Sequence, residues 1–384
     1  MLRCTPTRSR GGPASPAVAL DSYQKALGTL QEKIASLDVL AASNDDVVEV
    51  LGAALILTLA GFPRTGQDST AWSHHIAGLV TLIQLLDLGT IIADPLGNIL
   101  RESVAYFDIT AFSLGRPLRA RNAWLRWEIH PPEAVPADDF GNLEVAVGYP
   151  KSLLTIIAVV SSFLDNPEQD TALDLTGLVE RLYTHATADS LAYPTSTCTS
   201  EPDLDCNHSL PPDTFHKIET ALLLWQPPTP PKRLSSAVSV ALTGAWEIMR
   251  KATLLYLWRG SFTMDVLRPL PVRRAALTAR YVREMLFGLR TLLAYLESDG
   301  ITIMNVMTWP LAVIGNECGG DRQTQRKVLN LIDTMTTRFG IQHLEYVSAI
   351  LQELWRRFED QTEPSIPLCL ESLSKDMGIC VPLF

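Results

Sequence analysis

Apolar residues recur at steps of three and four along most of this chain, and that spacing constrains its fold more than any other feature. Leu27, Leu30 and Ile34 show it first, and such spacing lines one face of an α-helix. No segment shows the strong alternation that is typical of a half-buried strand, so the sequence predicts an all-α fold. The predicted helices begin at Asp21 and Asn44, span about residues 70–86, 98–114, 151–164, 173–186, 234–259 and 271–297, and continue in three helices after Thr308, Asp321 and Gly340.

The segment after residue 307 has the clearest pattern. Thr308 is expected to cap a short helix that Gly319 and Gly320 end, and Asp321 to cap a second helix that ends at Gly340. In this helix and the next, the apolar residues fall on one narrow face, which predicts an antiparallel helical hairpin. The apolar positions are Val328, Ile332, Met335 and Phe339 in the first helix and Leu344, Val347, Leu351, Leu354 and Phe358 in the second.

Composition divides the chain into a tail and one large body. Residues 1–20 are rich in Arg, Pro, Ser and Gly and are expected to form a disordered N-terminal tail, whereas residues 21–384 are expected to form a single all-helical array of antiparallel hairpins. Four prolines make residues 128–150 an expected surface loop. The polar stretch 189–212 is predicted to be a flexible insertion, and 226–231 a Pro-rich spacer.

Charge and cysteine content exclude several classes of protein. A net charge of -10 and a pI near 5.2 argue against a chain that binds nucleic acid by itself, because phosphate binding needs an excess of Lys and Arg. The six cysteines include no C-x-x-C pair, so they indicate neither a disulfide framework nor a zinc ribbon. The longest apolar run, Val50 to Phe62, is shorter than the ~20 residues that span a bilayer, so no membrane contact is expected.

No strong catalytic motif is present, and no catalytic residue is predicted. The chain lacks the G-x-S-x-G, Walker A, G-x-G-x-x-G and H-E-x-x-H patterns. His185 and Asp189 fit an H-x-x-x-D acyltransferase pattern, but two fixed residues arise easily by chance.

Asp45, Asp46 and Glu49 support one enzymatic alternative. Acids one turn apart on a helix can hold magnesium against a diphosphate, as in all-helical cyclases. No second acidic ligand set accompanies them, so the favoured interpretation is a helix start with Asn44 as its cap.

Three further groups of residues are more consistent with structural roles than with ligand binding. The spacing of Cys198, Cys206 and His208, which lie with Asp203 and Asp205 in the predicted insertion, matches no closed tetrahedral metal site. The adjacent His74 and His75 point to different sides of a helix and do not form a preformed ligand pair. Arg116, Arg119, Arg121 and Arg126 with Trp124 and Trp127 superficially resemble a nucleic-acid surface, but on an acidic chain a solvated bend is favoured.

The C-terminal residues resemble a known family. The stretch NVMTWPLAVIGNECGGDR, residues 305–322, and the later Leu354-Trp-Arg-Arg are similar to the fungal-specific transcription factor domain, which follows a binuclear zinc cluster in that family. Earlier landmarks agree in order: WSHHIAG, residues 72–78, and RESVAYFD, residues 101–108, so the resemblance spans roughly residues 20–384. The family motif falls on Trp72, His75, Gly78, Trp309, Pro310, Leu311, Gly315, Glu317, Asp321, Arg322, Trp355 and Arg357.

The resemblance implies an all-α transcription regulator in the nucleus, reduced to its helical regulatory domain, and not an enzyme. The family's zinc cluster needs six N-terminal cysteines, of which only Cys4 is found here, so no zinc or other cofactor is expected and DNA contact is expected only through partners. The implied partners are other transcription proteins or a second copy of the chain, with a small-molecule effector in an apolar groove between helices. Metabolic gene clusters are common targets in this family. The alternatives are the magnesium-dependent diphosphate enzyme and a non-catalytic scaffold.

The motif residues are expected to act structurally. Trp309 and Trp355 are predicted to bury their rings between the last helices. Glu317, Asp321 and Arg322 lie close together in the sequence and are predicted to form an ion-pair or capping cluster.

Overall fold

A computed structural model describes residues 16–36, 43–60, 70–85, 94–127, 148–165, 174–190, 212–232, 234–299, 307–360 and 367–384. Helices dominate these residues, which confirms the all-α prediction. The sheet found among them has two strands, β1 (Ser113–Leu114) and β2 (Val381–Pro382), which pair antiparallel with Leu114 opposite Val381.

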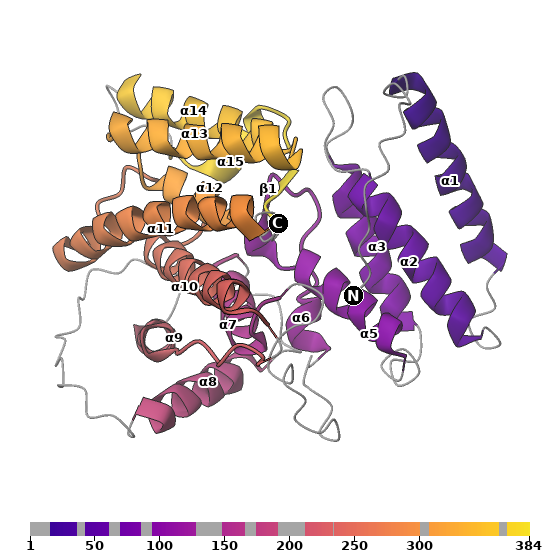
Figure 1. Ribbon diagram of the computed structural model, residues 1–384, viewed down its shortest axis with the longest axis horizontal. Helices are drawn as coiled ribbons and strands as arrows, with labels where there is room; N and C mark the ends of the chain where they lie inside the picture. The colour runs from indigo at the N-terminus through magenta and orange to yellow at the C-terminus, as the bar shows by residue number, and fades with distance from the viewer. Residues whose placement is uncertain are drawn as a thin grey trace.

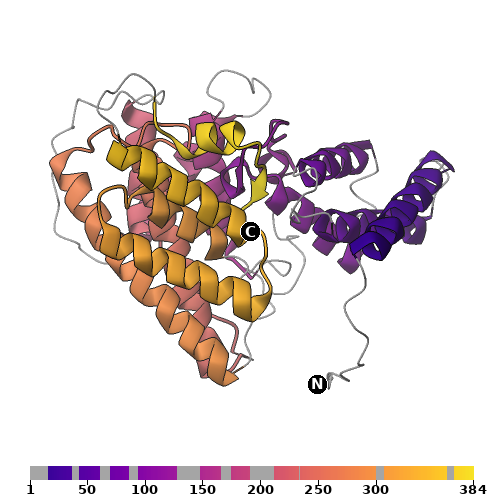
Figure 2. The ribbon, with the colours of Figure 1, turned by 90° about the horizontal axis from the view of Figure 1, so that it is seen from above.

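Four helices form an N-terminal group that projects from the rest of the molecule (Figures 1 and 2). They are α1 (Pro16–Ser36), α2 (Asn44–Ala60), α3 (Ala71–Leu85) and α5 (Pro95–Phe107), and α2 contacts each of the other three. Helix α1 begins at Pro16 rather than at Asp21, because the first turn of a helix tolerates proline. Helix α2 is capped by Ser43, whose Oγ accepts from the amide of Asp46 at 3.3 Å, so the prediction that Asn44 is the cap was wrong.

The predicted helix over residues 98–114 differs most from the structure. Asp94 starts the helix early, because its Oδ1 accepts from the amide of Gly97 at 2.8 Å. The helix stops at Phe107. The carboxylate of Asp108 then accepts hydrogen bonds from the backbone amides of Arg121 and Ala123, at 2.9 and 3.0 Å. The chain continues as a short 3-10 turn, η1 (Thr110–Phe112), and as β1, so the contact with the C-terminal strand overrides the helical pattern.

The central group comprises six helices whose packing partners differ in part from those expected. The predicted pair at 151–164 and 173–186 corresponds to α7 and α8, but α8 packs mainly against α9, and α10 packs against α11. Non-helical residues 225–231 connect α9 to α10. The six helices are α6 (Ala123–Arg126), α7 (Lys151–Asp165), α8 (Leu175–Ser190), α9 (Pro212–Leu224), α10 (Ser236–Arg259) and α11 (Val272–Asp299).

The C-terminal group contains α12 (Thr308–Asn316), α13 (Arg322–Phe339), α14 (Leu344–Asp360) and α15 (Leu370–Asp376). Helices α13 and α14 pack as the predicted antiparallel hairpin (Figure 1). Asp321 caps α13 and Gly340 ends it with a φ of 69°, as predicted. The predicted cap at Thr308 was wrong, because Met307 precedes α12 and Thr308 is its first helical residue.

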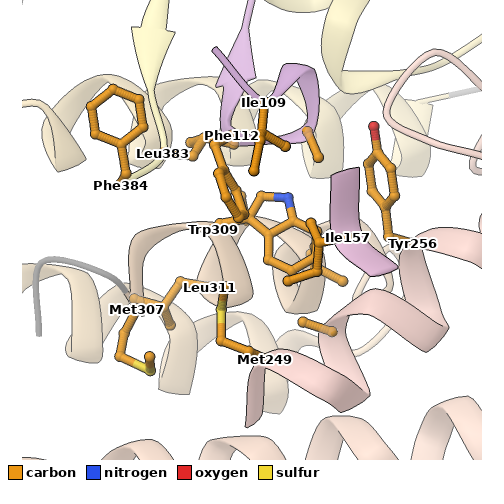
Figure 3. Packing of buried hydrophobic residues seen from close by; sticks show 14 of the residues in the cluster. Ile109, Phe112, Ile157, Met249, Tyr256, Met307, Trp309, Leu311, Leu383 and Phe384 are labelled. Atoms are coloured by element: carbon orange, nitrogen blue, oxygen red, sulfur yellow. The ribbon is translucent and has the colours of Figure 1, made fainter. Parts of the chain in front are cut away.

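One buried hydrophobic cluster runs from α2 to Phe384 and joins the three groups. At its centre, the ring of Trp309 lies edge-on to Phe112 and Tyr256, with centroid distances of 5.3 and 5.7 Å (Figure 3). These rings come from α12, η1 and α10, so one side chain ties together segments that are far apart in the sequence.

Candidate functional site

An apolar groove lies between the first three helices. It has a volume of about 320 Å³, and its walls are mostly apolar side chains from α1, α2 and α3, leucine being the most frequent. The stripe that predicted α1 forms one wall: Leu30 is buried, whereas Ile34 is 38% exposed. The groove is lined by Leu27, Leu30, Gln31, Ile34, Ala54, Leu57, His74, His75, Gly78, Leu79 and Leu82.

Two family-motif residues, His75 and Gly78, lie one turn apart on α3 and line this groove. The imidazole of His75 stacks on Tyr23 of α1 with a centroid distance of 6.5 Å. Burial is the main cause that lowers the pKa of His75, and the nearby His74 lowers it further. The ring is therefore neutral at pH 7 and has one donor and one acceptor nitrogen for hydrogen bonds to a ligand. A Cβ atom at Gly78 would meet no atom within 4 Å, so the missing side chain leaves space in the groove.

Trp72, the third motif residue on α3, connects this helix to the C-terminus. Its ring is fully buried and lies edge-on to Phe384 at 5.9 Å, and its Nε1 donates to the carbonyl of Cys380 at 3.4 Å. Helix α3 therefore presents one wall of the groove and also packs against the C-terminal segment.

The tryptophans on α12 and α14 are buried, in line with the structural role expected of them. Trp309 is fully buried, and Trp355 donates from Nε1 to the carbonyl of Gly315 at 2.9 Å. Gly315 permits this approach of α12 to α14, because a Cβ there would lie 2.6 Å from the Leu351 side chain. Pro310 is also buried, in the first turn of α12, where proline is tolerated.

Glu317, Asp321 and Arg322 do not form the predicted cluster, because each has a different partner. Glu317 pairs with Arg259 of α10, whose Nε lies 2.8 Å from Oε1, and both side chains are nearly buried. Asp321 Oδ1 accepts from the amides of Gln323 and Thr324, and a hydrogen bond from the Thr324 hydroxyl lowers the pKa of Asp321.

Arg322 and Arg357 form ion pairs on the exposed side of the hairpin. Arg322 pairs with Glu359 at 2.9 Å, which joins the start of α13 to the end of α14. Arg357 pairs with Glu353 at 2.8 Å and with Asp376 of α15 at 3.2 Å. Exposed pairs of this kind contribute at most about 1 kcal/mol each to stability.

The acids of the enzymatic alternative take part in a cap and in a salt bridge. Asp46 accepts from the Ser43 hydroxyl at 2.6 Å, and Glu49 pairs with Lys33 of α1 at 2.6 Å. Within the described ranges, no three His, Cys, Asp or Glu side chains gather as a metal-ion site. Glu49 thus joins α1 to α2, whereas Asp46 belongs to the cap of α2.

The arginine- and tryptophan-rich stretch closes onto the body of the protein. Arg116 and Asp108 form a buried ion pair at 2.9 Å. Trp124 is also buried and donates from Nε1 to the Thr155 hydroxyl of α7 at 3.1 Å. Trp127 is only 8% exposed, so neither ring is available to stack on a base.

The structure describes the side chains of neither of two further sets of residues singled out in the sequence. Cys198, Asp203, Asp205, Cys206 and His208 all fall between residues 191 and 211. The side chains of His185 and Asp189 are likewise outside the description, although the backbone of α8 includes both positions.

Comparison with known proteins identifies the family of the chain. A family model described as fungal specific transcription factor domain matches residues 8–380. The chain belongs to the fungal-specific transcription factor domain family. Searches of curated proteins and of solved structures find no match.

Membership in the fungal-specific transcription factor domain family indicates a transcription regulator. The match confirms the resemblance and extends it about twelve residues toward the N-terminus. No helix among the described residues is long and apolar enough to cross a membrane.

The family resemblance implies an effector groove, but the sequence does not indicate which residues line it. The apolar stripe of α1 and the motif positions His75 and Gly78 are visible in the sequence, but periodicity shows only that a face is apolar. It does not show that the neighbouring helices leave part of that face uncovered.

Proposed function

We propose that this protein is a nuclear transcription regulator that binds a small, largely apolar effector in the groove between α1, α2 and α3. The observation that carries the proposal is an apolar groove lined by two family-motif residues. Its volume of about 320 Å³ lies at the lower end of the range for small-molecule sites, about 300–1,000 Å³.

The lining supports a ligand with an apolar body and one or two polar groups. Leucine, isoleucine and alanine side chains provide most of the walls, and burial of apolar ligand surface against them supplies the main driving force. Gln31, His74 and His75 add hydrogen-bonding groups, and a neutral imidazole suits an uncharged ligand group.

We further propose that DNA is reached through a partner protein and that the target genes include a metabolic cluster. The net charge of -10 supports indirect DNA contact, because a strongly acidic chain is repelled by the phosphate backbone. Family resemblance supports the metabolic target. Chromatin immunoprecipitation beside a gel shift with the purified chain tests indirect contact: occupancy without a shift is expected, and a shift with pure protein contradicts it.

Filling the groove tests the proposed effector site. Gly78→Leu should abolish the fluorescence enhancement of 1-anilinonaphthalene-8-sulfonate bound to the native protein, because the new side chain occupies the space that Gly78 leaves. Thermal stability should not fall, since leucine favours the helical state by up to about 1 kcal/mol relative to glycine.

The matched control is Gly28→Leu on α1. Gly28 also has open space around its Cβ position but is not among the groove residues. Equal loss of dye binding in both variants, or unchanged binding in Gly78→Leu, would refute the effector site. If the dye binds as expected, apolar metabolites that displace it from the wild-type protein can be ranked by the increase in melting temperature that each produces.

A further inference from the structure

Helix α11 carries a basic face that the sites described above do not use. One side of the helix packs against α10 through buried Val282, Met285 and Leu289, and the helix runs along the edge of the molecule (Figure 2). The opposite side is solvent-exposed. The α11 basic face consists of seven residues that are all exposed: Arg273, Ala276, Arg280, Arg283, Phe287, Arg290 and Ala294.

The spacing places these residues on one side of the helix. At 100° per residue, the seven positions fall within an arc of about 100°. Arg283 and Arg290 lie two turns apart, about 10.5 Å along the axis, and Phe287 lies between them. The face is therefore a continuous strip about 30 Å long.

Most of its positive charge is not neutralised within the described parts of the chain. Arg280 pairs with Glu284 at 2.7 Å, and Lys251 also holds that carboxylate, at 2.9 Å. Arg273, Arg283 and Arg290 form no ion pair with any residue that the structure describes. A protein of net charge -10 thus concentrates unneutralised cations on one helix.

Phe287 indicates the kind of partner. Its side chain is 74% exposed and lies among arginines, and this combination of an aromatic residue with arginine is enriched at protein–protein interfaces. The phosphate backbone of a DNA duplex would match the arginines but would offer little apolar surface to this ring. An acidic protein segment would match both, with carboxylates for the arginines and an apolar side chain for Phe287.

We infer that the α11 basic face is a docking surface for an acidic, amphipathic helical segment of another protein. The inference goes beyond the effector site and stands on different residues. Because binding depends on exposed charges, it weakens steeply with salt.

The test uses the full chain and a fluorescein-labelled 20-residue peptide that carries glutamates and leucines on one helical face. Binding of the peptide is measured by fluorescence anisotropy at low salt. The wild-type protein should bind this peptide, and an analogue with glutamine at each glutamate should not bind. Arg283→Glu with Arg290→Glu should weaken binding about tenfold or more. Phe287→Ala should also weaken it, while circular dichroism shows all variants folded.

Matched controls separate this face from general charge and hydrophobicity. Arg181→Glu on α8 makes the same charge change at an exposed arginine, and Ile56→Ala removes an apolar side chain that is 67% exposed on α2. Both should bind as wild type does. Absence of peptide binding, or equal affinity in the double arginine variant, would overturn the inference.

DNA or a second copy of this chain could occupy the α11 basic face instead. Each gives a distinct experimental result, and either result would overturn the inference. A 20-base-pair DNA duplex that binds and loses affinity in Arg283→Glu with Arg290→Glu would assign the face to phosphate binding. Sedimentation that shows a dimer of wild type and a monomer of Phe287→Asp would assign it to a second copy of this chain.

Discussion

Trp309 and Trp355 are both buried, but their indole nitrogens have different surroundings. Trp355 donates to the carbonyl of Gly315, whereas Trp309 Nε1 finds no hydrogen-bond partner among the described residues. The contribution of Trp309 therefore comes from the contacts of its ring with Phe112, Tyr256 and the surrounding aliphatic side chains (Figure 3). The sequence predicted that both rings are buried, but not which rings they meet, because those rings belong to distant segments.

Trp309→Ala is expected to lower the free energy of unfolding by about 3–5 kcal/mol, because it leaves a cavity where three segments meet. Urea denaturation measures the loss. Trp309→Phe should cost much less, since it keeps an aromatic ring and removes the unpaired N–H group. A loss under about 1 kcal/mol in the alanine variant would show that the ring is not central to the core.

His343 gives the protein a pH-dependent stability. It lies before α14, and burial lowers its pKa to about 4. An unfolded histidine titrates near pH 6.5, so protonation favours the unfolded state, and stability present above pH 6.5 is lost as the pH falls toward 4. The loss attributable to this group should reach about 3 kcal/mol.

Urea midpoints between pH 7 and 4 measure this effect, with His343→Gln as the comparison. The variant should lose less stability over that window, because glutamine does not titrate. Parallel pH profiles for the two proteins would assign the acid sensitivity to other groups.

Among the elements, α10 and α12 are joined by the Arg259–Glu317 pair. The guanidinium also donates to the carbonyl of Arg268 at 2.8 Å, so Arg259 fixes the turn that leads from α10 toward α11. The motif predicted a role for Glu317, but nothing in the sequence indicated its partner, which lies 58 positions earlier. Local pairings such as the Asp321 cap were predictable because both partners lie within one turn.

Arg259→Met is expected to lower the free energy of unfolding by about 3–5 kcal/mol, because it leaves the buried carboxylate of Glu317 without its counterion. Adding Glu317→Leu should recover much of the loss. Arg322→Met, which breaks an exposed pair, serves as the control and should stay within about 1 kcal/mol of wild type. Equal effects in the two arginine variants would contradict this difference.

Asp321→Asn should cost less than Trp309→Ala, about 1 kcal/mol or below, because asparagine still caps a helix. Thermal denaturation followed at 222 nm compares the two. A larger loss in Asp321→Asn would mean that its negative charge has a further role.

At the scale of the whole molecule, helix α3 connects the groove to the C-terminus. His75 and Gly78 line the groove, while Trp72 contacts Phe384, whose ring also stacks on Phe107 of α5 at 4.3 Å. Periodicity predicted most helices with small errors at their ends. It could not predict how they assemble. The groove and the strand at residues 113–114 both depend on contacts between distant segments, so neither could be predicted from the sequence.

Phe384→Ala should reduce the stability of the N-terminal helices by about 3 kcal/mol, because its ring packs between α3 and α5. Hydrogen exchange resolved by mass spectrometry would show faster exchange in α3 and α5 than in α14. Uniform acceleration across the chain, or none, would contradict a specific role for this contact.

The most direct test of the central claim is transcript sequencing of strains of the source organism. It compares a strain that lacks this protein with strains that express wild type, Gly78→Leu or Gly28→Leu at equal level. If the protein regulates transcription through an effector in the groove, a defined set of genes should change in the deletion strain, return with wild type and Gly28→Leu, and fail to return with Gly78→Leu. An unchanged transcript profile in the deletion strain would contradict the regulatory function, and full rescue by Gly78→Leu would contradict the role of the groove.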